Sequence, residues 1–122
     1  MTRGEIWLVN LDPTVGSEIR KTRPCVVVSP SEMHHHLRTV LVAPMTTAGR
    51  EAPFRIGINH GGRKGLILLD QVRAVDKIRL AKNLGVVSAK TLTATLRTLQ
   101  EVLQNESQSS VEREQEYVGS PS

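Results

Sequence analysis

The sequence has few aromatic residues, a single cysteine and no long apolar run. Trp7, Phe54 and Tyr117 are its only aromatic residues, which argues against a binding surface made of rows of aromatic rings that stack on bases. Cys25 lies in an apolar run and has no partner for an internal disulfide, so we expect a small buried side chain. No stretch reaches the roughly 18 apolar residues of a membrane helix, and the N-terminus lacks a secretion signal. We therefore expect a cytoplasmic protein.

Charge is unevenly distributed along the chain. The formal net charge of the 122 residues is +4. From position 105 onward, four Glu and one Arg give −3, so residues 1–104 carry +7 from fifteen cations and eight carboxylates. A basic body favours anionic partners, either nucleic acid or an acidic protein, although the same charge also serves solubility. Residues 105–122 are polar and poor in large apolar groups, which predicts a disordered acidic tail after one domain of residues 1–104.

Short apolar runs separated by Pro and Gly dominate the chain before Ser88. They predict strands within residues 5–11, 25–29, 39–43, 54–58, 66–75 and 84–88. Ser88 is a suitable N-cap for a helix, and Leu92, Leu96, Leu99 and Leu103 follow at spacings of three and four residues. Residues 77–82 are expected to hold one more helical turn. Five or six strands and a terminal helix predict a mainly β fold, a small barrel with the helix packed on it.

The segment GSEIRKTRPCVVVSP, residues 16–30, places several charges beside a buried strand. Pro24 keeps Arg23 extended, and the strand that follows holds this cation on a stiff element, as a positioned site residue requires. Glu18 lies in the preceding loop, close enough to fold back toward Arg23. The alternative is a surface loop with loose ion pairs, each of which contributes little stability. This segment alone leaves both interpretations open.

Polar side chains also follow two other predicted strands. Thr46 and Thr47 come after VAPM, where their hydroxyls can donate to a phosphate or oxyanion; the alternative is a turn that caps its own backbone. Asp70 follows four apolar residues, so partial burial is expected to raise its pKa and suit it to proton transfer. The alternative for Asp70 is a carboxylate satisfied by the nearby backbone.

Two other motifs do not predict a metal or nucleotide site. In a loop, His34, His35 and His36 have no fixed geometry, and no Cys or carboxylate lies at ligand spacing, so we expect a solvated loop. The GGRKG segment lacks the GxxxxGK[ST] pattern of a phosphate-binding loop. We expect no metal and no cofactor. A cation, hydroxyls and carboxylates suit RNA cleavage, because RNA supplies its own 2′-hydroxyl nucleophile and needs only a base, a proton donor and positive charge.

Four segments taken in order resemble the MazF/PemK (Kid) toxins of bacterial toxin–antitoxin pairs: RGEIWLVNLDPTVGSE, TRPCVVVSP, VAPMTT and LLDQVRAVD. The resemblance implies an SH3-like barrel that forms a homodimer. It also implies a metal-independent, sequence-specific endoribonuclease that cuts single-stranded RNA, chiefly mRNA, to leave a 2′,3′-cyclic phosphate and a 5′-hydroxyl. The implied partner is a cognate antitoxin that covers the basic groove with an acidic, disordered segment.

The resemblance also assigns roles to individual residues. Arg23 and Thr46 match the functional arginine and threonine, Glu18 matches the loop glutamate, and Asp70 matches an acid that some members use as general base. Thr47 matches a hydroxyl that helps to hold the phosphate. We expect RNA contacts from Ser17, Arg20, Lys21, Thr47, Gln71 and Arg73.

Two departures from the PemK-like pattern affect these roles. Ser17 stands where PemK-like members carry His. MazF-like members more often have Ser at this position. Leu68 stands where PemK-like members place an arginine, so we expect Arg23 to act without a second cation. The division of roles between Glu18 and Asp70 stays open.

Two non-catalytic alternatives share the barrel. One is a CcdB-like toxin that acts through a protein interface, and the other is an RNA-binding module. The first expects functional residues at the end of the terminal helix, but this helix runs into a polar tail while Arg23 and Thr46 are present.

Overall fold

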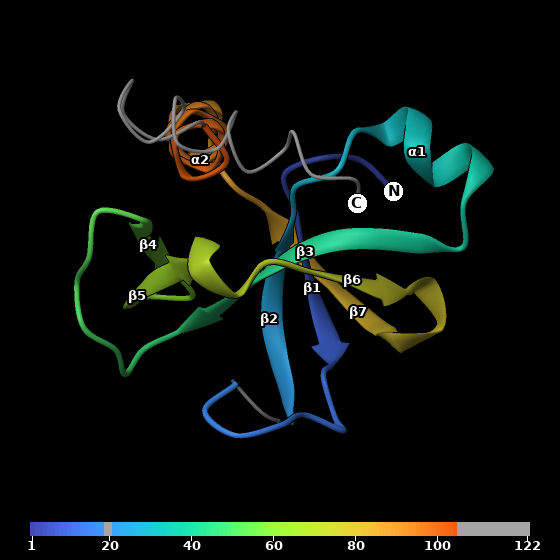
Figure 1. Ribbon diagram of the computed structural model, residues 1–122, viewed down its shortest axis with the longest axis horizontal. Helices are drawn as coiled ribbons and strands as arrows, with labels where there is room; N and C mark the ends of the chain where they lie inside the picture. The colour runs from blue at the N-terminus through green and yellow to red at the C-terminus, as the bar shows by residue number, and fades with distance from the viewer. Residues whose placement is uncertain (19–20, 105–122) are drawn as a thin grey trace, which may run out of the picture.

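In the part of the chain that the structure describes, seven strands form a curled antiparallel sheet, and a helix follows the last strand (Figure 1). The computed structural model describes residues 1–18 and 21–104. Its elements are β1 (Glu5–Asn10), β2 (Thr22–Val27), α1 (Ser31–His36), β3 (Thr39–Thr46), β4 (Arg55–His60), β5 (Arg63–Leu68), η1 (Leu69–Gln71), β6 (Arg73–Asp76), η2 (Lys77–Arg79), β7 (Leu80–Val86) and α2 (Ala89–Val102). The predicted mainly β fold with a C-terminal helix is confirmed. The predicted tail, residues 105–122, lies outside the described residues.

The long strand β3 connects the two parts of the sheet. The strand order is β4-β5-β3-β2-β1-β7, and β6 also pairs with β3. The first half of β3 pairs with β6, whereas Met45 and Thr46 at its end pair with β5. In Figure 1, β3 therefore crosses the middle of the molecule and ends beside the β4–β5 hairpin. This path places Thr46 between that hairpin and β2.

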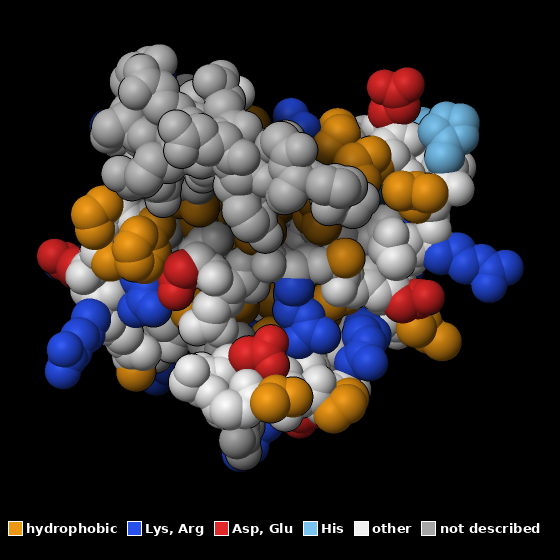
Figure 2. Space-filling model, viewed as in Figure 1, with side chains coloured by type: hydrophobic (Ala, Val, Ile, Leu, Met, Phe, Trp, Pro, Cys, Tyr) orange, Lys and Arg blue, Asp and Glu red, His pale blue; other side chains and the backbone are white. Residues whose placement is uncertain are grey.

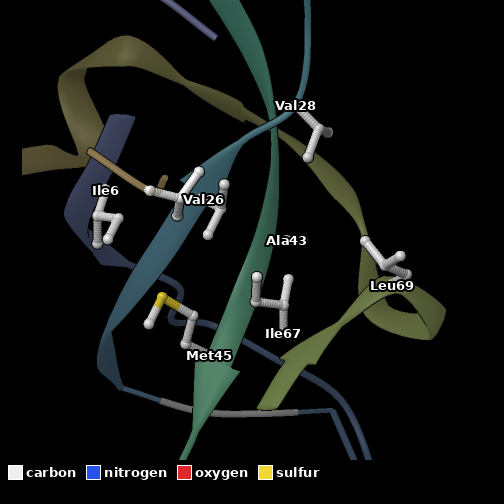
Figure 3. Close-up of a cluster of buried hydrophobic side chains, with 8 residues drawn as sticks. Ile6, Val26, Val28, Ala43, Met45, Ile67 and Leu69 are labelled. Atoms are coloured by element: carbon white, nitrogen blue, oxygen red, sulfur yellow. The ribbon is translucent and has the colours of Figure 1, made fainter. Parts of the chain in front are cut away.

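The apolar run in β2 is buried on both faces of the sheet. Val26 belongs to a hydrophobic core with Ile6, Met45 and Ile67 (Figure 3), and further apolar side chains complete it. Its neighbours Cys25 and Val27 belong to a second core on the other face. Full burial of one such apolar side chain contributes about 1.5–3 kcal/mol, and burial raises the pKa of the Cys25 thiol to about 12. The prediction of a buried cysteine is confirmed.

Helix α2 covers the first of these cores. Ser88 caps it as predicted, because its Oγ accepts a hydrogen bond from the Thr91 backbone N–H at 3.1 Å. Leu92 and Leu99 pack on the core, whereas Leu103 lies beyond the helix and is 74% exposed. No helix within residues 1–18 and 21–104 is long and apolar enough to cross a membrane. The turn expected within residues 77–82 is a 3₁₀ turn over Lys77–Arg79, and residues 80–82 already belong to β7.

The three histidines do not form the solvated loop that we expected. They end the short helix α1, and His34 is buried. Its Nε2 lies 2.6 Å from Oγ of Ser29, and its Nδ1 lies 3.2 Å from the carbonyl oxygen of Met1. The prediction of a solvated loop was wrong because Ser29 and Met1 provide hydrogen-bond partners for both ring nitrogens of His34, so the ring can be buried.

Replacement of Ser29 by alanine is expected to lower the free energy of unfolding by about 1–3 kcal/mol, the cost of an unsatisfied buried polar group. The Ser29 hydroxyl is buried, accepts from the Leu41 N–H at 3.0 Å and bonds His34. The matched control is Thr93→Ala on the exposed side of α2. Chemical denaturation of both variants measures the difference, and equal stabilities would contradict this account of the histidine.

Candidate functional site

Strands β2 and β3 bring Arg23 and Thr46 to one hollow. Arg23 pairs with Val9 of β1, and Thr46 pairs with Leu66 of β5. Both residues are half-buried, and both line a cavity of about 290 Å³, which we name the central cavity. Its polar lining residues are Ser17, Arg23, Thr46, Thr47, Arg55 and Gln71. Five of the predicted site residues therefore line this cavity: Ser17, Arg23, Thr46, Thr47 and Gln71.

A second hollow of about 210 Å³ adjoins the central cavity and shares Arg23, Thr46 and Thr47 with it. We name it the hairpin cavity, because its other wall comes from β4 and β5. This wall includes Ile58, His60, Arg63 and Gly65. His60 and Arg63 are not among the predicted site residues, because the glycine-rich turn between them was considered only as a phosphate-binding loop.

A third hollow of about 170 Å³ contains the two candidate carboxylates and is named the acidic cavity. Glu18, Asp70, Gln71 and Arg73 line it, and Gln71 also lines the central cavity. Glu18 is held in its loop because its Oε1 accepts from the Val15 N–H at 2.7 Å. Arg73 donates from Nη1 to the carbonyl oxygen of Leu11 at 3.2 Å, which ties β6 to the start of the same loop.

Asp70 is fixed by a guanidinium that the sequence analysis did not identify. Nε of Arg55 donates to Oδ1 of Asp70 at 3.1 Å, and Nη2 donates to Oδ2 at 3.0 Å. Chiefly through these hydrogen bonds, Arg55 holds the pKa of Asp70 below its ordinary value. The expected rise in the pKa of Asp70 is therefore wrong, because the charged partner on β4 outweighs the partial burial of the carboxyl group.

The Thr46 hydroxyl takes part in a local turn. Its Oγ1 donates to the carbonyl oxygen of Ala48 and accepts from the Ala48 N–H, both at 3.1 Å. This arrangement is the turn-capping alternative considered for the threonine pair. Since a hydroxyl has one proton, it must rotate away from the Ala48 carbonyl before it can donate to a ligand in the central cavity.

Of the two remaining predicted residues, the structure describes Lys21. Lys21 is exposed and lines none of the three, and its backbone N–H donates to Oδ1 of Asp12 at 2.9 Å. Arg20 lies outside the described residues. In the part of the chain that the structure describes, no group of three His, Cys, Asp or Glu side chains is placed to hold a metal. Figure 2 shows cationic and anionic side chains interspersed over the region of β2 and β6.

Comparisons with known proteins agree on one family. The model of the PemK-like, MazF-like toxins of type II toxin–antitoxin systems matches residues 2–103. Endoribonuclease PemK of Escherichia coli is 38% identical over 109 residues, 84% of this chain and 82% of that protein. Endoribonuclease toxin MazF of Escherichia coli K12 is 34% identical over 90 residues, 73% of this chain and 81% of that protein.

Solved structures share the fold. A crystal structure of MazF from Deinococcus radiodurans superposes with a TM-score of 0.75 at 26% identity, over 84% of this chain and 96% of that one. A mycobacterial endoribonuclease in complex with its cognate antitoxin superposes with a TM-score of 0.72 at 21% identity, over 84% of this chain and 94% of that one.

Proposed function

This chain belongs to the PemK-like, MazF-like toxins of type II toxin–antitoxin systems, and we propose that it is an endoribonuclease whose reaction takes place in the central cavity. The observation that carries this assignment is the cavity shared by Arg23 and Thr46. A guanidinium and a hydroxyl around one space can neutralise and hold a phosphodiester. We propose single-stranded RNA, chiefly mRNA, as the substrate, which would place its action in the cytoplasm.

The reaction we propose uses no metal ion. A base removes the proton of the RNA 2′-hydroxyl, and the O2′–P bond forms as the P–O5′ bond breaks. The departing O5′ receives a proton, so the products are a 2′,3′-cyclic phosphate and a 5′-hydroxyl. Arg23 neutralises the charge of the pentacoordinate phosphorane, while Thr46, rotated from Ala48, donates to a phosphate oxygen. We propose RNA contacts from Thr47, Ser17 and Gln71, because all three line the same cavity.

Glu18 is the better candidate for the base. Both oxygens of Asp70 accept hydrogen bonds from Arg55, and its pKa is lowered. A base whose pKa lies further below the working pH accepts a proton less readily. Glu18 lines the acidic cavity, which shares Gln71 with the central cavity, and its chain neighbour Ser17 lines the central cavity.

We propose two protein partners as well. The first is a cognate antitoxin whose acidic, disordered segment covers the basic body, with a charge of +7 over residues 1–104 as physical support. The second is another copy of this chain, in a homodimer that forms a groove for the RNA. We propose that the positive charges of Arg20, Lys21 and Arg73 attract the RNA or the antitoxin. Residues 105–122 are proposed to be a tail outside the folded domain.

The purified chain is expected to cut a long mixed-sequence RNA in buffer that contains EDTA, because the proposed chemistry needs no divalent cation. End-group analysis should find 2′,3′-cyclic phosphate on one fragment and 5′-hydroxyl on the other. A 2′-O-methylated copy of the RNA is the control, since it lacks the nucleophile and should stay intact. Binding of the RNA without cleavage would instead support the non-catalytic module, and cleavage only with added metal would exclude this mechanism.

A further inference from the structure

The ion pair between Arg55 and Asp70 spans two of the cavities. Arg55 lines the central cavity, together with Arg23 and Thr46. Asp70 lines the acidic cavity, together with Glu18. The guanidinium makes a two-pronged contact with the carboxylate, at 3.1 Å and 3.0 Å, which is the geometry that best fixes the plane of an arginine. Asp70 therefore lies on the side of the acidic cavity, and the arginine that it holds lines the central cavity, where we propose that the reaction takes place.

One more hydrogen bond fixes Arg55. Its Nη1 donates to the carbonyl oxygen of Arg50 at 3.0 Å. A Cβ atom added at Gly49 would lie 3.2 Å from Cγ2 of Thr46 and 3.6 Å from Nη1 of Arg55. The two side chains therefore flank the same small space, and a glycine leaves that space open.

The guanidinium keeps donors for a ligand. An arginine side chain has five N–H donors, and the bonds to Asp70 and Arg50 use three of them among the described residues. Two donors remain for a phosphate oxygen. Arg55 also pairs across the β4–β5 hairpin with Leu68, the position where the sequence analysis found no second cation. The neighbouring strand supplies a cation beside that position.

We propose that Arg55 is the second phosphate-contacting cation of the central cavity and that Asp70 is a positioning residue that orients it, an inference that rests on the proposed endoribonuclease function. Arg55 and Arg23 then approach one phosphodiester from β4 and β2. Two guanidinium groups share the charge of the phosphorane, and Asp70 gives up no proton and accepts none during the reaction. Asp70 keeps Arg55 rigid, so the cation need not be ordered when the substrate arrives.

Kinetics of three single variants and one double variant test these roles. Arg55→Gln is expected to lower kcat about 100-fold, as for loss of one preorganised donor, and Arg55→Lys to recover part of this loss because it keeps the charge without the fork. Asp70→Asn is expected to lose less than Arg55→Gln. The double variant should be no slower than Arg55→Gln alone, because Asp70 acts only through Arg55. If Asp70 were the base, its loss of about 10²- to 10⁴-fold would persist in the Arg55→Gln background.

Binding provides a readout that a purely structural role would not change. With 2′-O-methylated RNA as ligand, loss of one phosphate contact in Arg55→Gln should reduce the slope of log affinity against log salt by about 0.7. Asp70→Asn should leave a slope close to that of the wild type. Arg97→Gln, an exposed cation on α2, is the matched control for charge and should cut RNA normally.

The outcomes separate this inference from the proposed function. A wild-type chain that cuts RNA, with Arg55→Gln equally active, would overturn the role of Arg55 and leave the nuclease assignment intact. A persistent loss from Asp70→Asn in the double variant would overturn the positioning role. A wild-type chain that fails to cut RNA would remove both. The ion pair is partly exposed, with side chains 20% and 30% accessible, and such pairs contribute about 1 kcal/mol or less to stability, so circular dichroism should show all variants folded.

Discussion

The Arg23→Ala variant is expected to cut RNA about 100- to 1,000-fold more slowly than the wild type, the loss typical of removing one group that stabilises the charge of a transition state. Arg23 is half-buried on β2 and lines both the central and the hairpin cavity. It therefore borders the same two cavities as Thr46. The measurement is kcat/KM for a fluorogenic RNA in EDTA.

Two further variants separate the effect of the position of Arg23 from the effect of its charge. Arg23→Lys keeps the positive charge but cannot offer two parallel donors to a phosphate, so it should fall between alanine and wild type. Arg97→Ala removes an equal charge from the exposed side of α2 and should leave the rate unchanged. An equal loss from Arg97→Ala would show that net charge, rather than placement in the cavity, sets the rate. Wild-type activity in Arg23→Ala would remove this arginine from the mechanism.

The sequence predicts the fold well because its strands carry strong local signals. The run from Cys25 to Val28 has no polar residue, and the structure buries it on both faces of the sheet. Ser88 caps α2 as its position predicts. Local periodicity did not show the length of β7, because Ala81, Lys82 and Asn83 are exposed on an end strand and carry no apolar alternation.

The site was predicted less completely, because its key contacts join residues that are distant in the sequence. The Arg55 guanidinium reaches Asp70 across fifteen positions, and no local motif indicates that contact. The pKa of Asp70 was therefore judged from the apolar residues before it, which gave the wrong direction. The burial of His34 depends in the same way on Met1, 33 positions away, whose carbonyl oxygen pairs with Nδ1 of the ring. By contrast, Arg23 and Thr46 lie on strands that a nearby proline and an apolar run mark in the sequence, so their placement could be predicted from local sequence.

Gly65 provides a test of how tightly the backbone supports this site. It lies on β5 and lines the hairpin cavity beside Arg23 and Thr46. A Cβ atom at this position would lie 2.8 Å from the carbonyl oxygen of Thr46, which is closer than a carbon and an oxygen can approach. The obstacle is backbone held by the pairing of Thr46 with Leu66, so a side-chain rotation cannot relieve the contact.

The Gly65→Ala variant is expected to lose about 1–3 kcal/mol of stability, the cost of overpacking, and most of its activity, because relief of the contact displaces Thr46. Gly57→Ala on β4 is the matched control, since a Cβ there meets nothing within 4 Å; it should be neutral or gain about 0.4–1 kcal/mol from a less flexible unfolded chain. Denaturation and cleavage assays on both variants make the comparison. If the two alanine variants matched each other in stability and rate, the close packing of β5 against Thr46 could not be what holds the hydroxyl in place.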